Sequence, residues 1–203
     1  MSRLIALLLL LPAAALPPPS APFLSPMGEP FRSDDPAADN AGCWFGAADR
    51  NADGALSLAE LQADAARFFA ALDGDGDGEI GPAEIARYEN ELAPEVQLGL
   101  QMRRTDDWRR RRRREMLYDE GLEGAGRFSF LNIPQPVIAA DFDMNRGVSA
   151  EEFARAASQR FRLLDRDGDG RLLRAELPAL PRPRLRRRDR DSDKTWTPFR
   201  RPR

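Results

Sequence analysis

Two stretches of the chain carry apolar residues at the spacing of an amphipathic helix. Residues 58–72 contain neither proline nor glycine, and their apolar side chains recur every three or four positions, which predicts one unbroken helix. Residues 153–164 repeat this stripe. The apolar positions are Leu58, Leu61, Ala65, Phe68 or Phe69 and Leu72 in the first stretch, and Phe153, Ala157, Phe161 and Leu164 in the second. We therefore expect an all-α fold organised around two long helices.

Shorter helices are expected around these two. Asp34 or Asp35 can cap a helix that has Pro36 at its first position. Residues 95–120 follow a proline and contain no other proline and a single glycine, Gly99, so they predict another helix. Residues 132–136 are expected to start a short helix just before position 141.

The first long helix leads into twelve residues in which acidic side chains alternate with glycine. Residues 73–84 place oxygen donors at positions 1, 3 and 5, a glycine at 6, an apolar residue at 8 and a glutamate at 12. Calcium takes about six to eight oxygen ligands, so a loop that wraps one ion needs inward oxygens at alternate residues. The expected ligands are Asp73, Asp75, Asp77, Glu79 and Glu84. This spacing predicts a calcium-binding loop.

Three further stretches fit the same template, and we number the four in chain order. Loop one is 49–60, loop two 73–84, loop three 141–152 and loop four 165–176. The ligands expected outside loop two are Asp49, Asn51, Asp53, Ala55, Ser57 and Glu60; Asp141, Asp143, Asn145, Gly147, Ser149 and Glu152; and Asp165, Asp167, Asp169, Arg171 and Glu176. Position 6 of loop three is Arg146, where a positive φ costs a residue with a Cβ about 1 kcal/mol. Loop three is therefore expected to be the weakest site.

Apolar residues flank all four loops in the same register. They are Phe45, Phe69, Val137 and Phe161 four residues before each loop, and Leu61, Ile85, Phe153 and Leu177 just after it. Chance does not repeat flanks and ligands together in this way. Over residues 36–92 and 134–180, the chain resembles the EF-hand, calmodulin-like superfamily. The resemblance implies up to four bound Ca²⁺ ions.

The loops are closely spaced within each half of the chain. Loop starts lie 24 residues apart, at 49 and 73 and again at 141 and 165. A helix of fifteen residues is about 22 Å long, so the two loops of one half lie at its opposite ends and cannot touch. Their position-8 residues Leu56, Ile80, Val148 and Leu172 must then pair between halves, loop one with four and two with three, or between chains.

This close spacing is similar to that of lanmodulin, a secreted bacterial lanthanide binder. The similarity stops at spacing, because lanmodulin's loops have proline at position 2, where this chain has Arg50, Gly74, Phe142 and Arg166. Trivalent lanthanides are nevertheless expected to occupy such oxygen cages.

Composition excludes several classes of chemistry. The chain has no histidine and one cysteine, which excludes histidine-dependent catalysis, histidine zinc sites and an intrachain disulfide. The acid clusters are all assigned to metal loops, and no pair of nucleophile and base remains, so we do not expect an enzyme.

The ends and the middle of the chain differ from the loop regions. Residues 1–15 have a charged start, a short apolar run and small residues at a cut site, which predicts a signal peptide and no transmembrane span after processing. A proline-rich disordered leader is expected at 16–35 and a basic disordered tail at 181–203. Residues 93–133 are expected to be a helical linker with six consecutive arginines that begin at Arg109 and end at Arg114. We therefore expect two calcium-loop pairs, at 36–92 and 134–180, joined by this linker.

Two functions remain open. The first is an exported, periplasmic or secreted calcium binder that acts as a buffer, a sensor or a calcium-stabilised adaptor. The second is an interaction protein that docks a protein or an anionic surface through Arg109 to Arg114 and the basic tail, with calcium purely structural. No specific nucleic acid is expected as a partner.

Overall fold

The computed structural model describes residues 20–97, 116–117, 121–182 and 184–185. The predicted signal peptide, the arginine run of the linker and most of the basic tail lie outside these residues. Among the described helices, none has both the length and the apolar character needed to cross a bilayer.

Helices dominate the described part, and the strands are only two or three residues long. The α-helices are α1 (Asn40–Ala48), α2 (Leu58–Leu72), α3 (Pro82–Arg87), which continues into a π-helical turn (Tyr88–Leu92), and α5 (Ala150–Leu164). Short 3-10 helices occupy Pro94–Val96, Gly124–Arg127 and Ile138–Ala140. The strands are β1 (Phe23–Leu24), β2 (Pro30–Phe31), β3 (Ala55–Ser57), β4 (Glu79–Ile80), β5 (Met116–Leu117), β6 (Val148–Ser149), β7 (Arg171–Leu173) and β8 (Arg184–Leu185).

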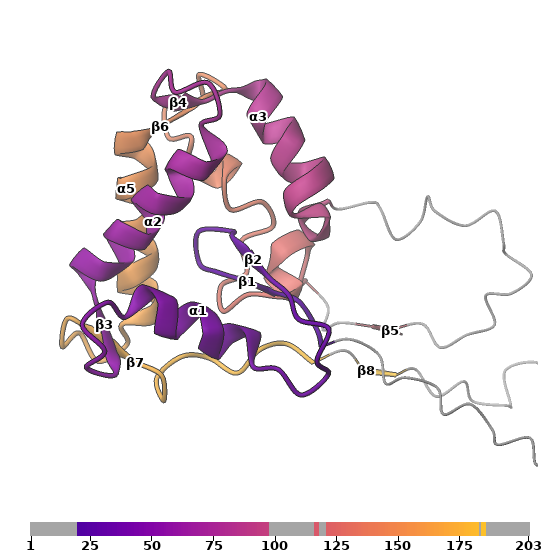
Figure 1. Cartoon of the computed structure of the whole chain (residues 1–203), viewed down its shortest axis with the longest axis vertical. Coiled ribbons are helices and arrows are strands. Elements are labelled where there is room, and N and C mark those ends of the chain that lie inside the picture. Colours follow the sequence, from indigo (N-terminus) through magenta and orange to yellow (C-terminus); the bar gives the residue numbers. More distant parts are fainter. Residues whose placement is uncertain (1–19, 98–115, 118–120, 183, 186–203) are drawn as a thin grey trace, which may run out of the picture.

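The two long helices predicted from the apolar stripes are confirmed. Each is preceded by a capping serine whose hydroxyl accepts a hydrogen bond from the backbone of the glutamate three residues later, while that glutamate accepts one from the serine backbone. These caps are Ser57 with Glu60 for α2, and Ser149 with Glu152 for α5. The helices lie side by side (Figure 1), and Gln62 of α2 donates to Ser158 of α5 at 2.9 Å.

The predicted pairing of loops between halves is also confirmed, and it occurs within one chain. Strands β3 and β7 are antiparallel and place Leu56 opposite Leu172, which joins loop one to loop four. Strands β4 and β6 place Ile80 opposite Val148, which joins loop two to loop three. We call these two strand pairs the loop ladders. In Figure 1 they lie at opposite ends of the α2 and α5 pair.

The halves share a common core and are not separate domains. One apolar cluster surrounds the second and third loops and includes Phe69 of α2 and Phe153 of α5, whose ring centroids are 5.7 Å apart. The other surrounds the first and fourth loops and includes Trp44 of α1 and Phe161 of α5. Residues from both halves fill each cluster, so neither predicted pair could bury its apolar face alone.

The leader predicted to be disordered is folded from residue 20 onward. Strands β1 and β2 form a hairpin that lies between the helices in Figure 1. Phe23 packs into the cluster around Trp44, whereas Leu24 packs into the cluster around Phe69, because successive strand residues point to opposite faces. The hairpin therefore joins the two clusters.

Polar contacts hold this hairpin in place. The buried guanidinium of Arg160 donates to the carbonyl oxygens of Pro26, at 3.0 Å, and Pro136, at 2.6 Å, and burial lowers its pKa to about 10. The Tyr88 hydroxyl donates to the Gly28 carbonyl at 2.7 Å, and burial raises the pKa of Tyr88. Arg67 of α2 bridges Glu29 of the hairpin to buried Asp64.

Three other local predictions need correction. The first helix is capped by Asp39, whose carboxylate accepts from the Gly42 amide, and not by Asp34 or Asp35. Where the helix expected over residues 95–120 can be described, the chain forms a 3-10 turn at Pro94–Val96 and the short strand β5 at Met116–Leu117. Both described ends of the predicted linker are core, since Val96 and Ala125 are buried in the cluster around Phe69.

Candidate metal centre

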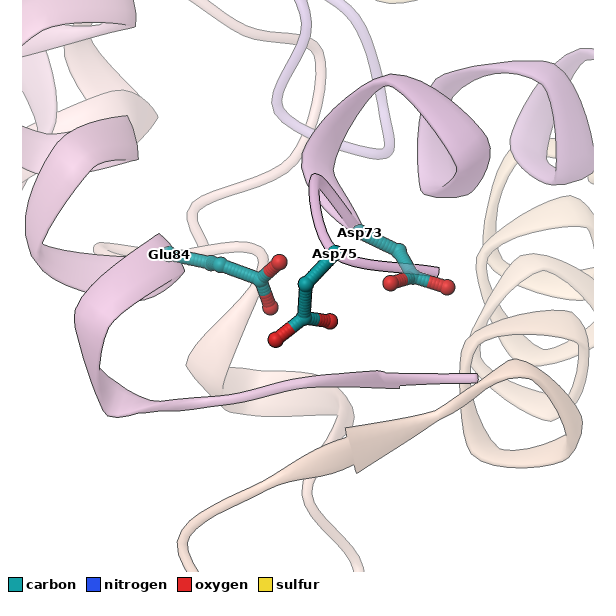
Figure 2. Close-up of side chains that lie close together, drawn as sticks. All are labelled: Asp73, Asp75 and Glu84. Carbon is teal, nitrogen blue, oxygen red and sulfur yellow. The ribbon is translucent and has the colours of Figure 1, made fainter. Parts of the chain in front are cut away.

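Loop two gathers its carboxylates around one point. Asp73 ends α2, Asp75 lies in the loop and Glu84 sits on α3, and Figure 2 shows their carboxylates converging. One oxygen from each lies within 4.8 Å of the others. Asp73 accepts from the amides of Gly76 and Gly78, at 2.8 and 3.1 Å, which bends the backbone around this aspartate.

Loops three and four form comparable groups. In loop three the group is Asp141, Asp143 and Glu152, again within 4.8 Å of one another. In loop four it is Asp165, Asp167 and Asp169, while Glu176 stands outside the group and accepts from the Leu173 amide at 2.9 Å. No α-helix follows loop four in the described chain, because Pro178 follows Glu176 by two residues.

Loop one is organised differently. Among the described residues, the carboxylates of Asp49, Asp53 and Glu60 do not form a group of this kind. Asn51 stands at position 3, and its side-chain amide donates to Asp53 at 3.2 Å. Loop one therefore has fewer converging carboxylates than the other three loops.

The closing glutamates of loops one and three are held ionised. The pKa of Glu60 is lowered chiefly by the hydrogen bond from the Ser57 amide, at 2.9 Å. The pKa of Glu152 is lowered chiefly by the Ser149 amide at the same distance. A carboxylate must be deprotonated to bind a metal, so both glutamates are in the state that calcium requires.

The remaining predicted ligands lie on or beside the strands. Ala55, Glu79, Gly147 and Arg171 occupy position 7, from which an EF-hand loop offers a backbone carbonyl. Ser57 and Ser149, at position 9, use their hydroxyls to cap α2 and α5 and to donate to Glu60 and Glu152. The structure thus places the position-9 serines as helix caps.

Backbone strain differs between the loops. As expected, Arg146 at position 6 of loop three is left-handed, with φ 81°. The backbone at position 4 is also left-handed, which the ligand spacing did not predict. Loop three has Met144 at this position, with φ 61°, and loop one has Ala52, with φ 55°. Loops two and four have glycine at both positions. Loop three alone carries two strained residues with a Cβ.

Replacing Arg146 with glycine is expected to tighten calcium binding at loop three by about fivefold. Glycine adopts the left-handed turn without the cost of about 1 kcal/mol that a Cβ adds. Calorimetric titration of the variant measures the change. Arg146→Ala is the matched control, because it removes the same charge but keeps the Cβ. Equal tightening by both variants would show that charge, and not the turn, limits this loop.

The donor chemistry fits calcium. All the side-chain donors are carboxylate or amide oxygens, which are the hard ligands that calcium prefers. None of these side chains offers the nitrogen or sulfur ligands that zinc and copper sites use. Each loop would hold one ion through the side chains at positions 1, 3, 5 and 12 and the carbonyl at position 7.

Comparison with known proteins agrees with this geometry. A family model described as EF hand matches residues 44–63, 65–87 and 158–177, which contain or overlap loops one, two and four. Loop three, with its arginine at position 6, is not in the matched segments. No curated protein and no solved structure matches the chain. The three matched segments are similar to EF hands, and this likeness, together with the acidic groups, suggests calcium binding.

Proposed function

We propose that this chain is an exported calcium-binding protein in which calcium stabilises the single fold, so that it serves as a buffer or a calcium-stabilised adaptor. The observation that carries the proposal is the joining of acidic loops across the two halves, through Leu56 with Leu172 and Ile80 with Val148. Each ion would reinforce a ladder that connects residues far apart in the chain. Export rests on the signal-peptide pattern of residues 1–15.

The role of calcium follows from charge. Folding brings like-charged carboxylates together, such as Asp73, Asp75 and Glu84, and their repulsion opposes the compact state. A bound cation supplies the opposite charge. Helices α2, α3 and α5 hold the ends of the loops in place, and this fixes the positions at which the carboxylates converge.

Calorimetric titration of the full chain with Ca²⁺ tests this proposal. We expect saturable binding of two to four ions per chain, with the number set by how well loops one and three bind. The same titration, monitored by ¹⁵N NMR, assigns each bound ion to a loop. The amides of Gly54, Gly78 and Gly170 serve as reporters, because they donate to the first aspartate of loops one, two and four. The absence of saturable binding at millimolar calcium would refute it.

The ladders predict which sites sense each other. Glu60→Gln in loop one is expected to weaken calcium at loop four by about fivefold, the lower end of typical coupling between sites, and to change loop two less than twofold. The reason is that a disordered loop one leaves the backbone of Leu172 without its partner at Leu56. The Gly170 and Gly78 amides report the two affinities.

Glu152→Gln is the matched control for this coupling. It removes the equivalent capping glutamate from α5 and is expected to weaken loop two while leaving loop four unchanged. If either variant weakened loops two and four equally, the effect would be general destabilisation and not coupling through a ladder.

A second candidate function rests on charge segregation. Residues 181–203 carry ten basic against three acidic residues, and the six arginines ending at Arg114 add a further basic run, so anionic surfaces are candidate partners. Binding to anionic lipid vesicles, measured with and without Ca²⁺, separates the candidates. A calcium-dependent affinity indicates a sensor, and an unchanged affinity indicates a scaffold in which calcium is structural.

A further inference from the structure

The two loop ladders have the same register, but the charged residue at the equivalent position is basic in one and acidic in the other. In each ladder, position 7 of one loop lies opposite the serine that caps a long helix in the partner loop. Glu79 of loop two lies opposite Ser149, and Arg171 of loop four lies opposite Ser57. A carboxylate therefore occupies one ladder at the place where a guanidinium occupies the other.

The side chain of Arg171 reaches into loop one. Its Nη2 donates to Oδ2 of Asp53 at 3.1 Å, across 118 positions of the chain. Asp53 is the position-5 ligand of loop one, and the same oxygen accepts from Asn51 Nδ2 at 3.2 Å. An oxygen that calcium would use is thus shared by two donors of the protein itself.

The side chain of Glu79 lies against loop three. It covers the buried backbone of Gly147, so closely that a Cβ at residue 147 would overlap the Glu79 carboxylate. Glycine at this position is what allows the approach. The carboxylate adds negative charge beside the loop that already gathers Asp141, Asp143 and Glu152.

We infer that Arg171 is an internal cation that competes with calcium for Asp53, so that a residue of loop four sets the affinity of loop one. Glu79 has the opposite effect and raises the affinity of loop three, which offsets part of the turn strain at Arg146 and Met144. The inference rests on the proposed calcium binding and deepens it by naming one residue in each ladder that changes the affinity of the partner loop.

The size of the effect follows from exposure. The side chains of Arg171 and Asp53 are 52% and 44% exposed, so their ion pair is weakened by solvent. Exposed pairs of this kind change an equilibrium constant by about two- to fivefold. Added salt screens exposed charges, so the effect is expected to shrink as ionic strength rises.

Arg171→Gln in the full chain tests the inference by ¹⁵N NMR titration with CaCl₂. The Gly54 amide, which donates to Asp49 at 2.9 Å, reports loop one. We expect its titration midpoint to fall about two- to fivefold, and less in high salt. Glu79→Gln is expected to shift the midpoint of the Arg146 amide, which donates to Asp141 at 3.0 Å, upward by a similar factor.

Arg174→Gln is the matched control. Arg174 is 51% exposed and stands three residues from Arg171, but it pairs with Asp39, which caps α1 and is not in a metal loop. This control is expected to leave the Gly54 midpoint unchanged. A Gly54 midpoint that is unchanged in Arg171→Gln, or that moves equally in the control, overturns the inference. If no loop amide of the unmodified chain responds to calcium, the proposed function itself is overturned.

Discussion

Removing calcium from the full chain is expected to lower its melting temperature by about 5–10 °C for each site that calcium had occupied. A ligand at about 100 times its dissociation constant stabilises the folded state by about 2.7 kcal/mol per independent site. In a chain of 203 residues, each kcal/mol shifts the melting temperature by about 2–4 °C. Without the cation, the clustered carboxylates of loops two, three and four repel one another.

Circular dichroism melts in excess CaCl₂ and in excess EDTA measure this shift. EDTA preloaded with an equal amount of calcium is the control, since it adds the chelator and its ionic strength without removing the ion. Both loop ladders join the two halves, so loss of calcium is expected to weaken the whole fold and not one half. Identical melting curves in calcium and in EDTA would show that the loops are acidic turns that hold no ion.

Leu24→Ala is expected to destabilise the protein by about 2–5 kcal/mol. Leu24 is fully buried in the cluster around Phe69, so its truncation removes apolar burial and leaves a cavity. The proline-rich composition around this residue predicts no such effect, which makes the variant a direct test of the hairpin. Urea denaturation in excess calcium measures the change.

Leu163→Ala is the matched control for this prediction. It makes the same chemical change on α5, but Leu163 is 62% exposed, and the expected change is less than about 0.5 kcal/mol. A Leu24→Ala variant as stable as this control would mean that the hairpin does not pack between the helices.

The sequence alone determined the long helices and the loops because both are local. The stripe from Leu58 to Leu72 and its repeat in α5 follow a period of 3.6 residues, which needs no knowledge of the rest of the chain. The ligand positions follow from the chemistry of one ion in twelve residues. A rigid helix of fixed length keeps the two loops of one half apart, so the sequence also predicted that Leu56 pairs with Leu172 or with a loop of another chain, and the structure shows the pairing with Leu172 within one chain.

Tertiary structure decided the parts whose local signal is weak. Strands β1 and β2 have two residues each, too few to show a period, and proline around them resembles a disordered segment. The hairpin is ordered because Phe23 and Leu24 fill two clusters built by helices far along the chain. The start of α1 at Asn40 similarly reflects the Asp39 cap and not the Pro36 signal.

The charge asymmetry of the two ladders was also beyond local sequence patterns. Arg171 and Glu79 both occupy position 7, and nothing in either loop alone says which neighbour the side chain will reach. The antiparallel register places Arg171 near Asp53, and Glu79 over Gly147. The sequence by itself therefore determined which residues occupy the ligand positions of each loop, whereas the tertiary structure decided which charges surround each loop, because those charges come from residues about 70 to 120 positions away.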